Sequence, residues 1–269
     1  MLYLSEKMLG YDPLEVTKSV EPRVYVERAG TGYRKYFRFR IDRWYGGIVT
    51  GDVVGCNMRC KFCWAWYFTW GDINRGDYYT ADEVSRKLVS LSESSGYRRA
   101  RLSGGEPTIG FKHLIEVVGK VISSGLSFVL ETNGVLLGLR REYSEQVGRF
   151  KGSGIEVRVS VKGTSPEEFY ELTGADPRFW YIQIEALKNL VEVGLEPARE
   201  VYPAVMLSLS GEDGLRKFSN ILQLIHPGLS ELVDEEYIIL YKHVKELIRK
   251  TGLRPRYVVL PDRVPSEMI

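Results

Sequence analysis

Cysteine is scarce in this sequence: the chain has three in 269 residues, and all of them lie between positions 56 and 63. An odd number in so short a window excludes a framework of paired disulfides and favours a metal or redox centre in a reducing compartment. Histidine is equally rare, and His113, His226 and His243 are far apart in the sequence, as expected of surface or helix residues.

An excess of one charge and long apolar runs are also missing. A net charge of +2 is nearly balanced, so there is no clear signal for nucleic acid, which usually binds a strongly basic face. No apolar run reaches the ~18 residues that span a bilayer. The first fifteen residues, MLYLSEKMLGYDPLE, carry charges among their apolar residues and lack a small-residue cleavage site. We therefore expect no secretory signal, no membrane partner and a cytoplasmic protein.

What the sequence does contain is a repeated order of strand and helix after residue 45. The predicted strands are 47–54, 99–103, 127–132, 156–161 and one within 196–207. Apolar residues at helical spacing fill the intervals, and Thr80 with Glu83 predicts a capping box at the start of the first of these helices. Successive strand ends are about thirty residues apart, the length of one βα unit. This order predicts an α/β fold with a parallel sheet, whose chemistry lies at the carboxyl ends of the strands.

The two ends of the chain are predicted separately. Residues 1–45 form an N-terminal extension, in which 24–27 and 36–42 make a hairpin about the turn-like residues 29–32. Residues 46–269 form the main domain with a C-terminal extension. After Pro227, the residues between 233 and 251 fit helical spacing, and we favour a helix there; 237–241 and 257–260 are the alternatives for a sixth strand.

The cysteines are separated by spacings of four and three residues, as Cys56, Cys60 and Cys63. Three thiolates from one short loop can converge on one metal centre. A structural zinc site is one interpretation, but such sites use four protein ligands, and the sequence supplies no fourth cysteine or nearby histidine. An iron–sulfur cluster with three cysteine ligands is the other interpretation, and it leaves one iron open for a small molecule.

This loop, with the aromatic Phe62 before its last cysteine, resembles the signature loop of the radical S-adenosylmethionine (SAM) superfamily. The resemblance implies a 4Fe–4S cluster on the three cysteines, SAM on the open iron, and a partial (β/α)6 TIM-type barrel open on one side. The turn Ser103–Pro107 is similar to the family's Gly-Gly-Glu-Pro motif. The resemblance implies that this motif receives the amino group of SAM through Gly104, Gly105 and Glu106.

The ends of the next two predicted strands hold further candidates. In 131–134 an Asn-Gly turn is as simple an explanation as ligand contact, and in 159–163 the lysine can equally be a solvated loop residue. A serine replaces the aspartate familiar in glycyl-radical activases at the latter strand, which weakens that analogy. The candidates that the resemblance implies for SAM here are Thr132, Asn133, Ser160 and Lys162.

Five aromatic side chains occupy the seven residues 64–70 directly after the cysteines. Ordinary packing beneath the cysteine loop is one explanation. A lid that keeps water from a reactive radical is the other.

The predicted function is that of an enzyme that cleaves SAM reductively and uses the resulting 5′-deoxyadenosyl radical to abstract hydrogen from an unidentified substrate. The resemblance implies an external low-potential electron donor, such as flavodoxin or ferredoxin. The substrate is a small molecule, a peptide or a partner protein. An activase that places a glycyl radical on a partner protein is the alternative within this class, and a non-catalytic zinc or iron–sulfur electron-transfer module is the alternative outside it.

Overall fold

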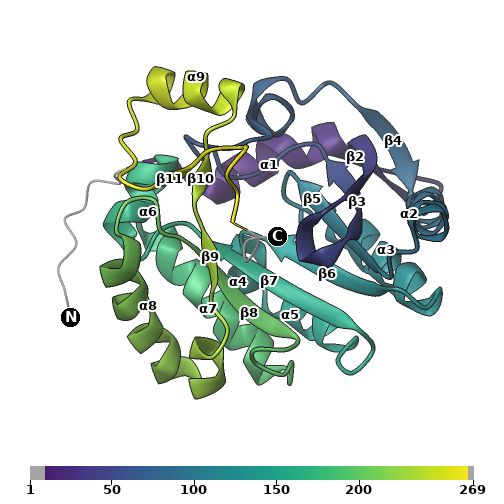
Figure 1. Ribbon diagram of the computed structural model, residues 1–269. Helices are drawn as coiled ribbons and strands as arrows, with labels where there is room; N and C mark the ends of the chain where they lie inside the picture. Colours follow the sequence, from purple (N-terminus) through teal and green to yellow (C-terminus); the bar gives the residue numbers. More distant parts are fainter. Residues whose placement is uncertain (1–9, 266–269) are drawn as a thin grey trace.

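The computed structural model describes residues 10–265 of the chain. Helices and strands alternate along most of that length (Figure 1). The helices and helical turns are α1 (Pro13–Val24), η1 (Trp44–Gly46), η2 (Tyr67–Gly71), α2 (Ala81–Ser95), α3 (Phe111–Ser123), α4 (Val135–Leu139), α5 (Arg141–Gly148), α6 (Pro166–Thr173), α7 (Arg178–Glu192), α8 (Gly211–Ile225), η3 (Pro227–Ser230) and α9 (Lys242–Thr251). The strands are β1 (Tyr25–Arg28), β2 (Thr31–Asp42), β3 (Ile48–Val53), β4 (Asp77–Thr80), β5 (Arg99–Gly104), β6 (Ser127–Thr132), β7 (Ile155–Val161), β8 (Val201–Met206), β9 (Asp234–Glu236), β10 (Ile238–Ile239) and β11 (Val258–Val259).

One large curved sheet forms the centre of the fold. Its strands are ordered β1-β2-β3-β5-β6-β7-β8-β9, and β4 pairs with β2. The six strands β3, β5, β6, β7, β8 and β9 run parallel, with helices packed outside them (Figure 1). In the described residues β9 does not pair with the opposite edge, so the sheet stays open. The predicted partial barrel of six parallel strands is confirmed.

Alternation along the central strands gives the sheet two different faces. On β5, Ala100 and Leu102 belong to the main hydrophobic core, whereas Arg101 and Ser103 line the interior of the partial barrel. The same alternation on β7 places Arg158 inside. Because successive side chains of a strand point to opposite faces, apolar residues pack against the helices and polar ones face inward. A closed barrel of this type usually has an apolar interior, so a polar interior marks a site for a polar ligand.

The N-terminal hairpin is confirmed. β1 pairs antiparallel with Thr31–Arg34 of β2 about residues 29 and 30, so the second arm begins earlier than predicted. The predicted second arm, 36–42, pairs antiparallel with β3 instead. The extension is thereby joined to the main sheet, and the predicted boundary after residue 45 stays a prediction. Helix α1 was not predicted, although the sequence carries its start signal: Asp12 Oδ1 accepts a hydrogen bond from the Leu14 N–H at 2.7 Å, and Pro13 is the first helical residue.

The preference for a helix over the whole of 233–251 is wrong. Only α9 is helical there, and β9 is the sixth parallel strand, paired with β8 through Ala204↔Asp234 to Met206↔Glu236. The alternatives 237–241 and 257–260 contribute β10 and β11 instead, which pair with each other. A three-residue strand is too short to show an alternation of apolar and polar residues in the sequence. Its extended conformation is decided by pairing with the free edge of β8.

Within residues 10–265, none of the helices combines the length and the apolar character that crossing a membrane requires.

Candidate active site

A single cavity of about 2080 Å³ opens inside the partial barrel, at the carboxyl ends of the parallel strands. It gathers all the residues that the sequence singled out. These are Cys56, Cys60, Phe62, Cys63, Gly104, Gly105, Glu106, Thr132, Asn133, Ser160 and Lys162. The structure thus brings the predicted site residues together, and their individual roles stay predictions.

The cysteine loop is held to its surroundings by backbone hydrogen bonds. The N–H of Gly55 donates to the carbonyl of Phe68 at 2.9 Å, and that of Cys56 donates to Thr69 at 3.0 Å. Burial raises the pKa of the Cys56 thiol well above its ordinary range and that of Cys60 to about 12. Burial thus favours the neutral form of both thiols, opposed at Cys60 by the charge of Lys162.

Hydrogen-bond donors surround the sulfur atoms. The N–H of Met58 lies 3.4 Å from Cys56 Sγ, and the Thr69 hydroxyl lies 3.6 Å from Cys63 Sγ. Asn133 Nδ2 lies 3.8 Å from Cys56 Sγ and donates to Asn57 Oδ1 at 2.7 Å. The buried Nδ2 of Asn57 has no partner among the described residues, an arrangement that suits an additional acceptor at this loop.

The Gly-Gly-Glu turn is bonded to the segment that leads into the cysteines. The N–H of Gly105 donates to the Val53 carbonyl, and the N–H of Glu106 donates to the Gly55 carbonyl, both at 2.9 Å. A Cβ at position 105 would lie 2.2 Å from the Gly55 oxygen. Glycine is needed there because the two backbones approach so closely, and the turn therefore fixes the position of the cysteine loop.

The carboxylate of Glu106 ties the ends of β5 and β6 together. Its Oε1 accepts from the Thr108 N–H at 3.0 Å and from the hydroxyls of Thr108 and Thr132 at 2.6 and 2.7 Å. Its Oε2 accepts from a single donor among the described residues, the Asn133 N–H at 2.8 Å. A carboxylate oxygen has two lone pairs, so Oε2 retains the capacity to accept from a ligand.

Ser160 and Lys162 are bound to a residue that sequence reasoning did not identify, Glu236 on β9. The Ser160 hydroxyl lies 2.8 and 2.9 Å from the two oxygens of Glu236, and Lys162 Nζ contacts both Ser160 Oγ and Glu236. Burial favours the neutral form of Glu236, but Lys162 and Arg158 lower its pKa to about 2. The sequence did not point to Glu236 because residues 233–251 were predicted as a helix, not as a strand that faces the cavity.

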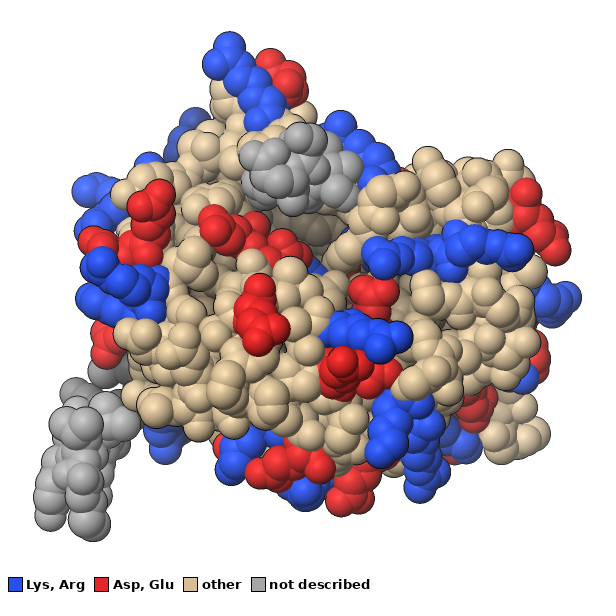
Figure 2. Space-filling view, turned by 60° about the horizontal axis from the view of Figure 1, so that its bottom comes forward, with Lys and Arg blue, Asp and Glu red and all other residues tan. Residues whose placement is uncertain are grey.

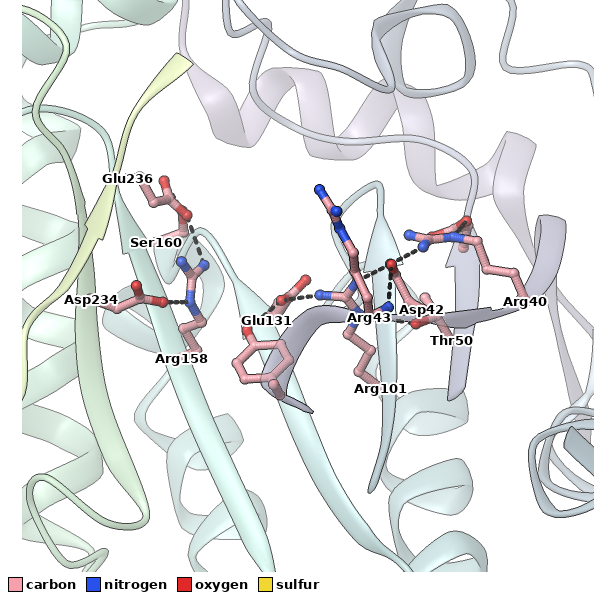
Figure 3. Close-up of polar contacts among 12 residues, drawn as sticks. Arg40, Asp42, Arg43, Thr50, Arg101, Glu131, Arg158, Ser160, Asp234 and Glu236 are labelled. Carbon is pink, nitrogen blue, oxygen red and sulfur yellow. Dashed lines mark hydrogen bonds and ion pairs between the residues drawn. The ribbon is translucent and has the colours of Figure 1, made fainter. Parts of the chain in front are cut away.

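A network of ion pairs extends across the interior below these residues (Figure 3). Arg158 pairs with Asp234 at 2.5 Å and with Glu236 at 2.7 Å. Arg101 pairs with Glu131 at 2.6 Å and with Asp42 at 2.7 Å. Alternation in the sequence carried a signal for both arginines, since Arg158 lies two residues before the predicted site residue Ser160, and Arg101 lies two residues before Ser103, at the start of the Gly-Gly-Glu turn.

Charges of both signs also lie close together at the surface. Figure 2 shows acidic and basic side chains interspersed around a hollow, with neither sign forming a broad patch on that face. Among the cations that line the cavity, Arg43 and Arg256 form no ion pair with a described residue. Arg43 points into the open space above the network in Figure 3.

The aromatic segment after the cysteines has a mixed environment. Phe68 stacks on Phe37 with ring centroids 4.1 Å apart, which is ordinary packing. Trp64 lines the cavity and is 39% exposed, with the guanidinium groups of Arg38 and Arg40 at 5.7 and 5.8 Å from its ring. Phe68 thus packs within the fold, whereas Trp64 borders the cavity.

In residues 10–265, no set of three or more His, Cys, Asp or Glu side chains is already gathered around a single-ion position. The assignment of the three cysteines as ligands therefore rests on their spacing in the loop and on the family of the chain.

The family is established by comparison. The sequence pattern of the radical SAM superfamily matches residues 52–213, and the chain belongs to that superfamily. It is a radical SAM enzyme, and members of this superfamily use a 4Fe–4S cluster and SAM and need a reductant.

The individual proteins that resemble this chain share less than 30% of its sequence. A probable GTP 3′,8-cyclase of Saccharolobus islandicus (strain M.14.25 / Kamchatka #1) is 28% identical over 236 residues, which cover 80% of this chain and 70% of the relative. A probable GTP 3′,8-cyclase of Sulfolobus acidocaldarius is 27% identical over 186 residues, 68% of this chain and 52% of the relative. The solved structure of TYW1 with a lysine-pyruvate adduct bound has a TM-score of 0.50 at 14% identity and covers 91% of this chain and 90% of its own. That structure shares the fold.

Proposed function

We propose that this enzyme cleaves SAM reductively at a 4Fe–4S cluster held by Cys56, Cys60 and Cys63, and then abstracts hydrogen from a small polar substrate in the same cavity. The observation that carries this proposal is that the three thiols and the Gly-Gly-Glu turn border one cavity with a charged interior. A radical formed there would be close to any molecule that the interior binds.

The residues of the loop fit a cluster. Three cysteines leave one iron without a protein ligand, and N–H and O–H donors near Cys56 and Cys63 would stabilise the negative charge of the thiolates. The unpartnered Nδ2 of Asn57 is one more donor at this position. Cluster binding would also displace the protons that burial holds on the thiols.

The residues around the loop fit SAM. Oε2 of Glu106 would accept from the SAM ammonium group, and Lys162, held by Glu236, would face its carboxylate. When bound, the cluster and SAM supply one-electron cleavage of the sulfonium C–S bond, which yields methionine and the 5′-deoxyadenosyl radical. The chain's own part is to bind, orient and exclude water.

The substrate is proposed to be a small molecule with an anionic group. Arg43 and Arg256 line the cavity without ion-pair partners among the described residues, and both are exposed to an incoming ligand. Arginine binds phosphate and carboxylate groups through two parallel hydrogen bonds. Since the relatives are named as probable GTP 3′,8-cyclases, a nucleoside triphosphate is the first substrate to test.

The experiment is anaerobic reconstitution with iron and sulfide, followed by dithionite and SAM, with 5′-deoxyadenosine measured by chromatography. We expect a brown protein that forms 5′-deoxyadenosine, and a Cys60→Ala variant that loses both the colour and the product. Arg59→Ala, an exposed change in the same loop that leaves the cavity lining intact, is the matched control and should retain both. An intact cluster that forms no 5′-deoxyadenosine would refute the proposal.

The same assay tests the substrate. Added GTP should raise the rate of 5′-deoxyadenosine formation and be consumed with it, and Arg43→Ala should weaken that response. If neither GTP nor another nucleoside triphosphate changes the rate, the substrate assignment is wrong while SAM cleavage stands.

A further inference from the structure

Helix α9 carries a concentrated positive charge on its outer face. Its ten residues include four lysines and arginines against one glutamate, in a chain whose net charge is only +2. In the described part of the chain none of these four forms an ion pair. The exposed cations are Lys242, Lys245, Arg249 and Lys250.

The opposite face of α9 holds the helix against the molecule. Val244 and Leu247 are buried, and Val244 belongs to a hydrophobic cluster against which Phe62 of the cysteine loop packs. Lys242, Lys245 and Arg249 are spaced by three and four residues, which places them on one stripe of the helix. The basic stripe therefore points outward, as expected for α9 at the outer edge of the molecule (Figure 1).

Helix α9 also contacts the cysteine loop and the aromatic segment directly. His243 Nε2 lies 2.8 Å from the carbonyl oxygen of Trp64, the residue after Cys63. Lys250 Nζ lies 5.9 Å from the centroid of the Trp66 ring. A molecule that docks on the outer face of α9 would therefore lie beside the residues that flank the cysteines.

Exposed aromatic groups border the same region. Trp64 is 39% and Tyr67 42% exposed, and the guanidinium of Arg75 lies 4.8 Å from the centroid of the Tyr67 ring. Exposed tryptophan, tyrosine and arginine are enriched at protein interfaces, where rings provide contact area and cations provide orientation.

We propose that the outer face of α9, with the exposed rings of Trp64 and Tyr67, is the docking surface for the electron donor, a small acidic protein with a low-potential one-electron centre. This inference rests on the proposed function, because it takes the cysteine loop as the destination of the electron. One electron leaves the reduced donor, which is oxidised, and reduces the cluster; no bond forms or breaks in this step.

The positive charge and the small extent of the α9 surface favour an acidic protein over a nucleic acid as the binding partner. Nucleic-acid surfaces usually extend over a broad basic face of a strongly basic domain, whereas here the excess is confined to one short helix. Opposite charges on two small surfaces mainly raise the rate of encounter and fix the orientation of the partners, which is what repeated delivery of single electrons requires.

The test compares two reductants on the reconstituted holoenzyme. SAM cleavage is measured with dithionite, and separately with an acidic flavodoxin kept reduced by its reductase and NADPH. In a Lys242→Glu/Lys245→Glu/Arg249→Glu variant, the flavodoxin-driven rate at low salt should fall by about tenfold or more, while the dithionite-driven rate stays at the wild-type value. Added salt should lower the wild-type flavodoxin-driven rate and leave the dithionite-driven rate unchanged.

The matched control reverses three exposed cations on α2, α7 and α8, as Arg86→Glu/Lys188→Glu/Lys217→Glu. It changes the net charge equally and should keep the flavodoxin-driven rate. An equal loss in both variants, or no loss in the α9 variant, would overturn the docking surface; so would an α9 variant that loses RNA binding while its flavodoxin-driven rate is unchanged. If wild-type enzyme with an intact cluster fails with dithionite, the proposed function itself fails.

Discussion

At the scale of single residues, His113 shows how burial decides the chemistry of a side chain. It was expected on a helix or at the surface, and it lies on α3 with only 1% of its surface exposed. Its Nε2 is 3.0 Å from the Tyr36 hydroxyl, and its Nδ1 is 3.4 Å from the Gly32 carbonyl. Burial lowers the pKa of His113 to about 4, so it is neutral at physiological pH and its role is structural.

His113 should make the fold sensitive to acid. Because its pKa in the folded chain lies below the ordinary value of 6.5, the unfolded chain binds more protons between pH 6.5 and 4. The stability from neutral His113 is present above pH 6.5 and is lost as the pH falls toward 4, by an amount approaching about 3 kcal/mol. Urea unfolding at pH 7.5 and 4.5 should show a smaller loss for His113→Gln than for the wild type. Equal losses would contradict this role.

At the scale of elements, most of the long strands and helices followed from the sequence, whereas helix α1 and the three-residue strand β9 did not. β6 spans the predicted residues, and α2 begins with the predicted capping box, in which the Glu83 N–H donates to Thr80 Oγ1 at 3.2 Å and the Thr80 N–H donates to Glu83 Oε2 at 2.8 Å. Such signals are local. The bond between the Gly-Gly-Glu turn and the residues before Cys56 joins segments about fifty residues apart, so its geometry came only from the fold.

Adding a methyl group at that turn should displace the cysteine loop. In Gly105→Ala the new Cβ would meet backbone oxygens of Gly55 and Val53 at 2.2 and 2.8 Å. We expect a loss of about 1–3 kcal/mol in the free energy of unfolding and less iron retained per chain after reconstitution. Gly119→Ala on α3 is the control, since its Cβ would make only ordinary contacts at 3.6 Å. Full iron content in Gly105→Ala would refute the proposed coupling.

At the scale of the whole molecule, ion pairs connect strands that are not neighbours. Arg158 on β7 reaches past β8 to Asp234 and Glu236 on β9, and Arg101 on β5 reaches past β3 to Asp42 at the end of β2. These contacts cross the concave face of the sheet (Figure 3). They hold the partial barrel curved while leaving it open.

Removing both members of an ion pair in this network should cost less than the sum of the two single removals. Arg158→Met leaves Asp234 and Glu236 without their main partner, and we expect a loss of about 3 kcal/mol in the free energy of unfolding. Arg158→Met/Asp234→Asn should lose less than the sum of the single variants, because one unpaired charge is removed as well. Chemical denaturation of the four proteins measures this coupling, and strictly additive losses would show that the two residues act independently.

The sequence by itself determined the chemistry of the cysteine loop, the order of strands and helices, and the strand ends that hold the site. Each of these depends on residues close together in the chain: three thiols in eight positions, or apolar residues at a regular period. The tertiary structure alone decided that Glu236 binds Lys162, that β9 is a strand, and that α9 lies beside Trp64. Those contacts join residues between 30 and 179 positions apart, and only the closing of the chain into a curved sheet brings such residues together.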